Sequence, residues 1–378
     1  MAVSDPHVIA EFMNSLEKNL DILRKCYVQD GGFGKLAADS AEAMNGGKYA
    51  AFISVCDINT RAAVLRGVGE SPETAWDSAC RNAREYVRKN GLNPAWVKSD
   101  ITVRSEKVTF TKLEELIAKS RNEFFRRGIS FDEGMHTALI EGEINGSRVI
   151  TYKEHKIELA RVNKRLSACG LRTLTAFQEE VRLFDCRSFF TDGGGVYPLY
   201  ESGNNCGRRI ISKFDDKTAL KVIETAAQYL ENMVGLDGKF EYGYYPIFHK
   251  EIPGYNILRH SSSIWSLICS YRLTKDKFTL NQIQKAIGYM VANTFKKYPD
   301  RPGVTNTVYL AEKSKGEVKV GGNAIAVIML TEFMDATGSH RYRTLCEELG
   351  NGIMELFDKR DGSFFHVLNF PTLSPKDK

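Results

Sequence analysis

The segment from Asp237 to His260 brings together side chains that could perform acid–base chemistry. It offers Glu241 and Glu251 as carboxylates and His260 as an imidazole. Glycoside hydrolysis needs two carboxyl groups facing each other across the scissile bond, about 5 Å apart in retaining enzymes and wider in inverting ones. We therefore predict that Glu241, Glu251 and His260 are catalytic, and that Asp361, from a related segment near the end of the chain, joins them.

Aromatic and basic residues of the same segment could bind a substrate. Tyrosine faces suit sugar rings, and a histidine or tyrosine base would serve epimerisation or lyase chemistry. Arg259 and His260 follow the predicted start of a helix, where an anionic group such as a uronate or a phosphate would be stabilised. The predicted substrate-binding residues are Tyr242, Tyr244, Tyr245, His249, Tyr255, Arg259 and His366.

Each of these candidates has a structural alternative. The Asp-Gly pairs at 237–238 and 361–362 are typical of turns in which the carboxylate accepts hydrogen bonds from the backbone amides that follow. Asn256 and Asn323 each open a helical run, as N-cap residues do. The tyrosines could pack in a core, and His260 could belong to a buried polar network.

Helical runs with a common spacing must position these side chains. Small residues recur in three of the runs at intervals of 62, as Ala226, Gly288 and Gly350, and a turn follows each run. Such a period is typical of stacked supersecondary units. The predicted helices span residues 217–234, 256–273, 280–295, 322–336 and 341–357.

Four short motifs accompany the predicted helices. They are Asp237-Gly238-Lys239-Phe240, Pro253-Gly254-Tyr255-Asn256, Gly321-Gly322-Asn323 and Asp361-Gly362-Ser363-Phe364. Helical hairpins with turns of this kind resemble the (α/α) toroid superfamily, which includes six-hairpin glycosidase-like enzymes, sugar epimerases and lyases, and more distantly terpenoid cyclases. The resemblance covers residues 216–378. It implies a fold whose interhelical loops meet at one mouth.

The same resemblance implies a function. We expect a carbohydrate-active protein, glycosidase- or epimerase-like, in surface-polysaccharide metabolism, with a carbohydrate or an anionic sugar as its ligand. Toroids have six or seven hairpins and this chain shows two and a half, so we expect an incomplete toroid that a protein partner could complete. The aspartate-rich metal motifs of terpenoid cyclases are missing, and we expect no metal and no cofactor.

Two other functions stay open. The first is a non-catalytic scaffold that binds a glycan or a protein through the same groove. The second is a peptide- or lipid-modifying enzyme on the same helical framework. Facing carboxylates in an open cleft would favour hydrolysis, whereas carboxylates that point apart would favour the scaffold.

The first third of the chain has mixed character. Runs rich in β-formers at 48–57 and 61–69 flank a turn, Ser71-Pro72-Glu73 opens a helix, and residues 96–110 alternate as a strand pair would. We predict an α+β module over 1–135, a connecting region over 136–215, and an all-α, incomplete toroid of helical hairpins over 216–378.

No residue of the α+β module is predicted to be catalytic. Trp76 and Trp96 are interpreted as core residues, and Glu141 and Glu143 as solvated surface charges.

Composition limits the class of protein. The net charge of +5 is diluted over 378 residues without a dense basic stripe, so we expect no nucleic-acid partner. The longest apolar run, 324–330, is too short to cross a bilayer, and we expect no membrane span. The eight cysteines form no C-x-x-C pair, and no secretory signal precedes them, so we expect a cytoplasmic protein.

Overall fold

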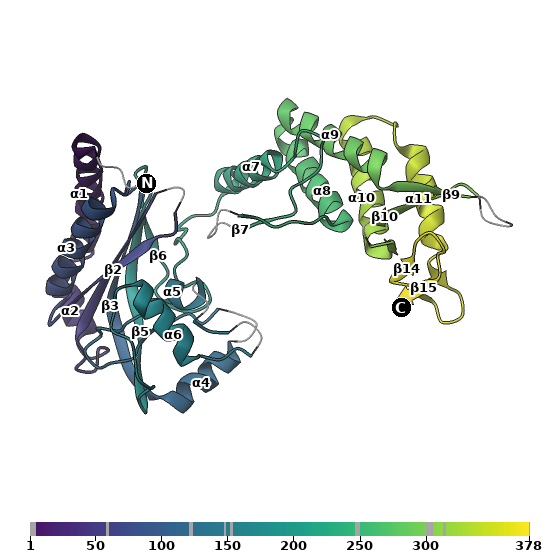
Figure 1. The fold of residues 1–378 in the computed structure, drawn as a ribbon. Coiled ribbons are helices and arrows are strands. Elements are labelled where there is room, and N and C mark those ends of the chain that lie inside the picture. Colours follow the sequence, from purple (N-terminus) through teal and green to yellow (C-terminus); the bar gives the residue numbers. More distant parts are fainter. Residues whose placement is uncertain are drawn as a thin grey trace. The chain divides into compact units, whose positions relative to one another are not determined.

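The computed structural model describes residues 5–57, 60–120, 124–146, 149–151, 154–245, 250–299, 302, 305–312 and 315–377. The chain forms two compact units, Met1–Ser212 and Lys213–Lys378, called unit 1 and unit 2 (Figure 1).

A six-stranded antiparallel sheet forms the centre of unit 1. Its strand order is β2-β1-β3-β5-β4, and β6 pairs with β5. The strands are β1 (Tyr49–Cys56), β2 (Ala63–Gly69), β3 (Trp96–Thr109), β4 (Gly128–Ser130), β5 (Glu180–Thr191) and β6 (Val196–Leu199). The two β-rich runs pair as predicted, with Tyr49 opposite Gly69. β5 and β6 come from the range predicted as a connecting region.

Residues 96–110 do not form the predicted strand pair. They form the single strand β3, which pairs with β5 over most of its length. No glycine or proline interrupts this stretch, so the chain has no signal at which to turn back.

Helices cover both faces of the unit 1 sheet (Figure 1). Alternate residues of β1 enter different cores: Ile53 packs with α1, α2 and α3, and Phe52 packs on the opposite face. The helices are α1 (Pro6–Gln29), α2 (Gly32–Ser40), α3 (Pro72–Asn90), α4 (Phe110–Lys119), α5 (Glu141–Gly146) and α6 (Leu159–Ala168). As predicted, Ser71 caps α3 and Pro72 is its first residue.

Unit 2 contains all five predicted helices. They are α7 (Asp216–Asn232), α8 (Ile257–Thr274), α9 (Lys277–Asn293), α10 (Val320–Thr337) and α11 (Arg343–Met354). Their apolar faces share one core, in which α8 contacts α7, α9 and α10.

The prediction of an all-α, incomplete (α/α) toroid is nevertheless wrong, and so is that of a helical repeat. Segments between and after the helices form a five-stranded antiparallel sheet of order β15-β14-β11-β10-β9. Its strands are β9 (Phe295–Tyr298), β10 (Thr307–Glu312), β11 (Glu317–Lys319), β14 (Val367–Asn369) and β15 (Pro375–Asp377). Two small hairpins add β7 (Tyr244–Tyr245) with β8 (Lys250–Glu251), and β12 (Phe357–Asp358) with β13 (Ser363–Phe364). Unit 2 is therefore mixed α+β, and there is no toroid for a partner to complete.

The burial of β10 explains why this sheet escaped prediction. Val308 and Leu310 enter the helical core, while Tyr309 and Ala311 enter a second cluster on the other side. A short strand buried on both faces shows no alternation of polar and apolar residues, so periodicity does not reveal it.

The structural alternatives for the turn and cap residues have mixed outcomes. Asp237 accepts a hydrogen bond from the Lys239 amide (2.9 Å) and Asp361 from the Ser363 amide (3.1 Å), so both Asp-Gly turns are confirmed. The turn predicted after the helical run 280–295, at residues 299–303, lies largely outside the described residues.

Of the two predicted N-caps, one is confirmed. The Asn256 side chain accepts from the Arg259 amide at the start of α8 (3.0 Å). Asn323 lies inside α10 instead, where its side chain bonds both the amide and the carbonyl of Leu310 in β10. These hydrogen bonds link α10 to β10 of the sheet.

Among the helices of the described residues, none combines the length and the apolar character needed for a membrane crossing.

Candidate functional site

Five of the predicted site residues line one pocket at the start of α8. The pocket has a volume of about 200 Å³, and these five are Glu241, Tyr242, Tyr255, Arg259 and His260. The other residues around it are Tyr229, Leu230, Met233, Phe240, Gly243, Asn256, Ser262 and Ser263.

A second pocket, of about 470 Å³, shares Asn256 and Arg259 with the first. It reaches the start of α10 and the segment before β14, which contributes His366. Its charged lining residues are Arg259, Glu312, Glu317 and Lys319. We call the two pockets together the Arg259 site.

Side-chain oxygens already accept hydrogen bonds from backbone amides in the first turn of α8. Glu312, buried in β10, accepts a hydrogen bond from the Ile257 amide at 3.2 Å, while Asn256 takes the amide of Arg259. Two of the amides that a helix start would offer to an anion are thus occupied. Positive charge at this position must therefore come from side chains.

Arg259 supplies that charge. Its guanidinium lies over the Tyr242 ring, 4.8 Å from the ring centroid, in a cation–π contact. Within the described residues it forms no ion pair with a carboxylate, and the side chain is exposed. Lys239 lies in a similar way over Tyr255, at 5.7 Å. An aromatic ring thus holds each cation, and Arg259 keeps its hydrogen-bond donors for a ligand.

His260 cannot contribute charge at neutral pH. The residue is only 2% exposed, and burial lowers its pKa from 6.5 to about 4, against smaller opposite effects of the hydrogen bond to Ala286 and of the Asp237 charge. Nε2 lies 3.2 Å from the carbonyl oxygen of Ala286, which can only accept, so Nε2 carries the proton. Nδ1 has no hydrogen-bond partner in the described part of the chain.

Aromatic rings enclose this imidazole. The ring centroids of Phe240, Tyr255 and Tyr289 lie 5.0, 5.5 and 5.6 Å away. Burial also raises the pKa of Tyr255, with smaller contributions from the charges of Tyr289 and Glu312, so this phenol stays protonated. Its hydroxyl has no hydrogen-bond partner among the described residues.

The other predicted residues that the structure describes line neither pocket. Tyr244, Tyr245 and Glu251 belong to the β7–β8 hairpin, where Glu251 is opposite Tyr244. Asp361 bonds Ser363 in the turn between β12 and β13. His249 lies outside the described residues.

The described lining of the smaller pocket contains no carboxylate pair. Glu241 is the sole carboxylate among the described residues that line it. In the larger pocket, Glu312 holds α8 and lies 3.3 Å from the Lys315 ammonium, while Glu317 pairs with Lys319 (3.1 Å) and Lys376. Hydrolysis of a glycosidic bond needs two facing carboxyl groups that are free to act. This arrangement suits binding better than hydrolysis.

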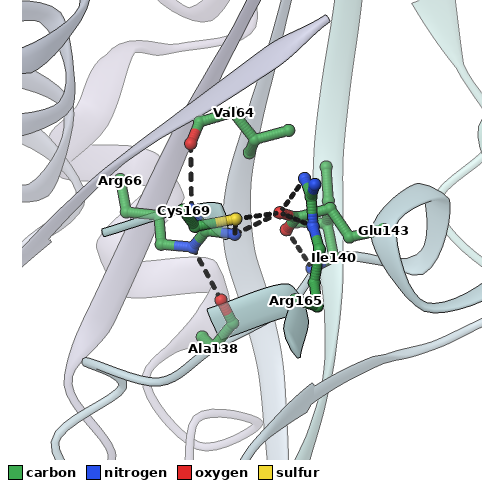
Figure 2. A network of polar contacts seen from close by, with 7 residues as sticks. All are labelled: Val64, Arg66, Ala138, Ile140, Glu143, Arg165 and Cys169. Atoms are coloured by element: carbon green, nitrogen blue, oxygen red, sulfur yellow. Dashed lines mark hydrogen bonds and ion pairs between the residues drawn. The ribbon is translucent and has the colours of Figure 1, made fainter. Parts of the chain in front are cut away.

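Sequence reasoning missed charged residues in both units. Glu317 and Lys319 lie in the short strand β11, which was not predicted. Glu143, interpreted as a surface charge, is 2% exposed and pairs with Arg66 and Arg165 (Figure 2). The signal that could have found Glu143 is its place between Ile140 and Ile144, whose helical spacing marks a buried face.

The described residues contain no group of three or more His, Cys, Asp or Glu side chains that could hold a metal ion. No model of a known protein family matches the chain, and no curated protein is similar to it in sequence.

Proposed function

We propose that unit 2 binds an acidic saccharide at the Arg259 site. The carboxylate or phosphate of the sugar accepts hydrogen bonds from the Arg259 guanidinium, and its rings lie against the tyrosines around it. One observation carries this proposal: a guanidinium without a carboxylate partner in the described chain lies over Tyr242, where two pockets meet.

The rest of the lining supports a polar, ring-shaped ligand. Glu241, Ser262 and Ser263 offer hydrogen bonds to hydroxyl groups, and Tyr242 and Tyr255 offer aromatic surface. The adjoining pocket of about 470 Å³ provides space for a further part of the ligand, with Lys319 and His366 in its wall.

We favour binding without turnover, which is the scaffold hypothesis in its glycan-binding form. The smaller pocket offers a single carboxylate in the described chain, and the pKa of His260 makes it a weak base near pH 7. We further propose that the protein works in the cytoplasm, because all eight cysteines are free thiols, as a reducing compartment maintains them.

Matched acidic and neutral sugars test the proposal. Trigalacturonate is compared with its methyl ester, and glucose 1-phosphate with glucose, by calorimetric titration of the full chain. Since a hydrogen bond to a charged group contributes about 1.5–3 kcal/mol, the acidic member should bind roughly ten- to a hundredfold more tightly. Arg259→Gln should remove this preference.

Arg341→Gln is the matched control. Arg341 is also an exposed arginine over a tyrosine, at 5.4 Å from the Tyr342 ring, but it lines neither pocket. This variant should keep wild-type affinity. Equal affinity for the acidic and neutral sugars, or turnover of either, would contradict the proposal.

A further inference from the structure

Unit 1 has a separate cavity of about 280 Å³. Strands form its floor, through Val64 of β2, Trp96 and Lys98 of β3 and Phe190 of β5. The residues Gly142 and Glu143 of α5, together with Arg165 of α6, lie across it. This volume is near the lower end of the range of small-molecule pockets, about 300–1,000 Å³.

Figure 2 shows a buried ion network, of which Glu143 and Arg165 line this cavity. Glu143 Oε1 accepts hydrogen bonds from Arg66 and from Arg165, whose Nη2 lies at 2.7 Å and Nε at 3.2 Å. The Cys169 thiol lies 3.5 Å from the same oxygen. Glu143 Oε2 accepts from the Ile140 amide at 3.1 Å. Every oxygen of this carboxylate is therefore occupied.

The network has more positive than negative charge. Arg66 and Arg165 share one carboxylate, so the three groups carry a net charge of +1, and their side chains are 7%, 15% and 2% exposed. A buried charge without a counterion is costly, and an anion placed nearby would lower that cost.

The two arginines differ in the hydrogen-bond donors that they have left for a ligand. Each nitrogen of Arg66 already donates a hydrogen bond, because Nε and Nη1 donate to the carbonyl oxygens of Ala138 (2.8 Å) and Val64 (2.9 Å). Arg165 lines the cavity and bonds through Nε and Nη2, which leaves Nη1 without a hydrogen-bond partner in the described part of the chain.

Two further cations line the same cavity. Arg61 is exposed, but partial desolvation and the nearby charge of Arg165 lower its pKa, against smaller opposite effects of Glu143 and Cys169, so these guanidiniums repel each other. Lys98 pairs with Asp100 at 2.7 Å. An anion between Arg61 and Arg165 would relieve the repulsion.

The other walls are apolar and aromatic. Trp96, interpreted from the sequence as a core residue, is 41% exposed and lines the cavity together with Phe190, Val64 and Ile140. Flat aromatic surface beside a guanidinium suits a ligand with an apolar ring and an acidic group.

We propose that this cavity binds an aromatic carboxylate, with the carboxylate on Arg165 and Arg61 and the ring against Trp96 and Phe190. A monoanion matches the net charge of the network, and a guanidinium fork matches the geometry of a carboxylate. The site is independent of the saccharide site proposed in unit 2.

Acid–amide pairs test this proposal on the full chain. The probes are benzoate, 1-naphthoate and indole-3-acetate, each beside its primary amide, with phenyl phosphate as a further anion. Ligand-observed NMR ranks them and calorimetry gives Kd. Titrations in the Arg259→Gln background separate this cavity from the unit 2 site. At least one carboxylate should bind about tenfold or more tightly than its amide.

Four variants locate the binding. Arg165→Lys keeps the positive charge but loses the forked pair of donors, and it should weaken carboxylate binding about tenfold. Arg61→Gln should weaken it roughly two- to fivefold, as an exposed ion pair does. Trp96→Ala should also weaken it, because the ring surface is lost. Arg81→Gln, the same change as Arg61→Gln but on the exposed side of α3, should have no effect.

Urea unfolding checks that each variant is folded. If Arg165→Lys does not fold, the affinities of Arg61→Gln and Trp96→Ala test the proposal. The proposal is overturned if acids and amides bind equally, if no carboxylate binds, or if phenyl phosphate binds more tightly than every carboxylate. Unchanged affinity in both Arg61→Gln and Trp96→Ala would overturn it as well.

Discussion

His260 shows at the scale of one residue how burial decides chemistry. An imidazole beside an arginine and three serines looks like a catalytic base or an anion ligand in the sequence. In the fold it is enclosed by Phe240, Tyr255 and Tyr289, and burial lowers its pKa to about 4. The residue types at the site were predictable from the sequence, whereas their protonation states follow from contacts distant along the chain.

The His260 pKa predicts an acid-sensitive fold. The imidazole has a folded pKa of about 4 and an ordinary pKa of 6.5, so the unfolded chain binds more protons between these values. The contribution of His260 to the free energy of unfolding is therefore fully present above pH 6.5 and is lost as the pH falls toward 4. The total loss is about 3 kcal/mol. In urea unfolding at pH 7 and pH 4, His260→Phe should reduce the difference between the two free energies of unfolding.

His366→Phe provides the comparison for this experiment, since His366 is an exposed histidine of the same unit. It should leave the pH dependence as in the wild type. A histidine NMR titration gives the pKa directly, and a His260 midpoint near 6.5 would contradict the account.

At the scale of elements, Glu312 joins the unit 2 sheet to the helix that presents Arg259. It lies at the end of β10 and accepts from the first amide of α8. This link depends on a strand that short-range patterns do not reveal. The sequence predicts α8 and its Asn256 cap, but it does not predict that Glu312 accepts the hydrogen bond of the Ile257 amide.

Removing this link should loosen the Arg259 site. Glu312→Ala leaves the buried Ile257 amide without its acceptor, which should lower the free energy of unfolding by about 1–3 kcal/mol and weaken sugar binding. Glu312→Gln keeps an acceptor oxygen and should cost less. Urea unfolding and calorimetry measure the two effects.

An exposed ion pair supplies the control. Glu347 pairs with Arg343 at 3.2 Å on the surface of α11, and Glu347→Ala should cost no more than about 0.5 kcal/mol. If Glu312→Ala is as mild as this control, Glu312 does not position α8.

The elements of unit 2 also show which structural features sequence patterns can predict. All five helices were predictable, because caps and apolar faces at helical spacing are local signals. The sheet was not, since β11 pairs with β14 about fifty residues later in the chain and each strand is short. The 62-residue spacing predicted the helices and the two Asp-Gly turns correctly and the architecture wrongly.

At the scale of the whole molecule, the chain divides at residues 212 and 213 into units that have separate cores. In the described parts of the chain, the sheets of units 1 and 2 share no strand. A unit with its own core and complete sheet can fold alone.

Each unit should therefore fold as an isolated fragment. Fragments 1–212 and 213–378 should each unfold cooperatively in urea, with circular dichroism spectra that add up to that of the full chain. Fragment 213–378 should retain the sugar affinity. A fragment without cooperative unfolding would contradict the division.

A crystal structure of the full chain with trigalacturonate would test saccharide binding at the Arg259 site most directly. We expect a sugar carboxylate within hydrogen-bond distance of the Arg259 guanidinium, about 2.7–3.2 Å, with the saccharide in the pockets on either side of this residue. A saccharide bound elsewhere on the molecule, or one whose carboxylates make no contact with Arg259, would contradict it.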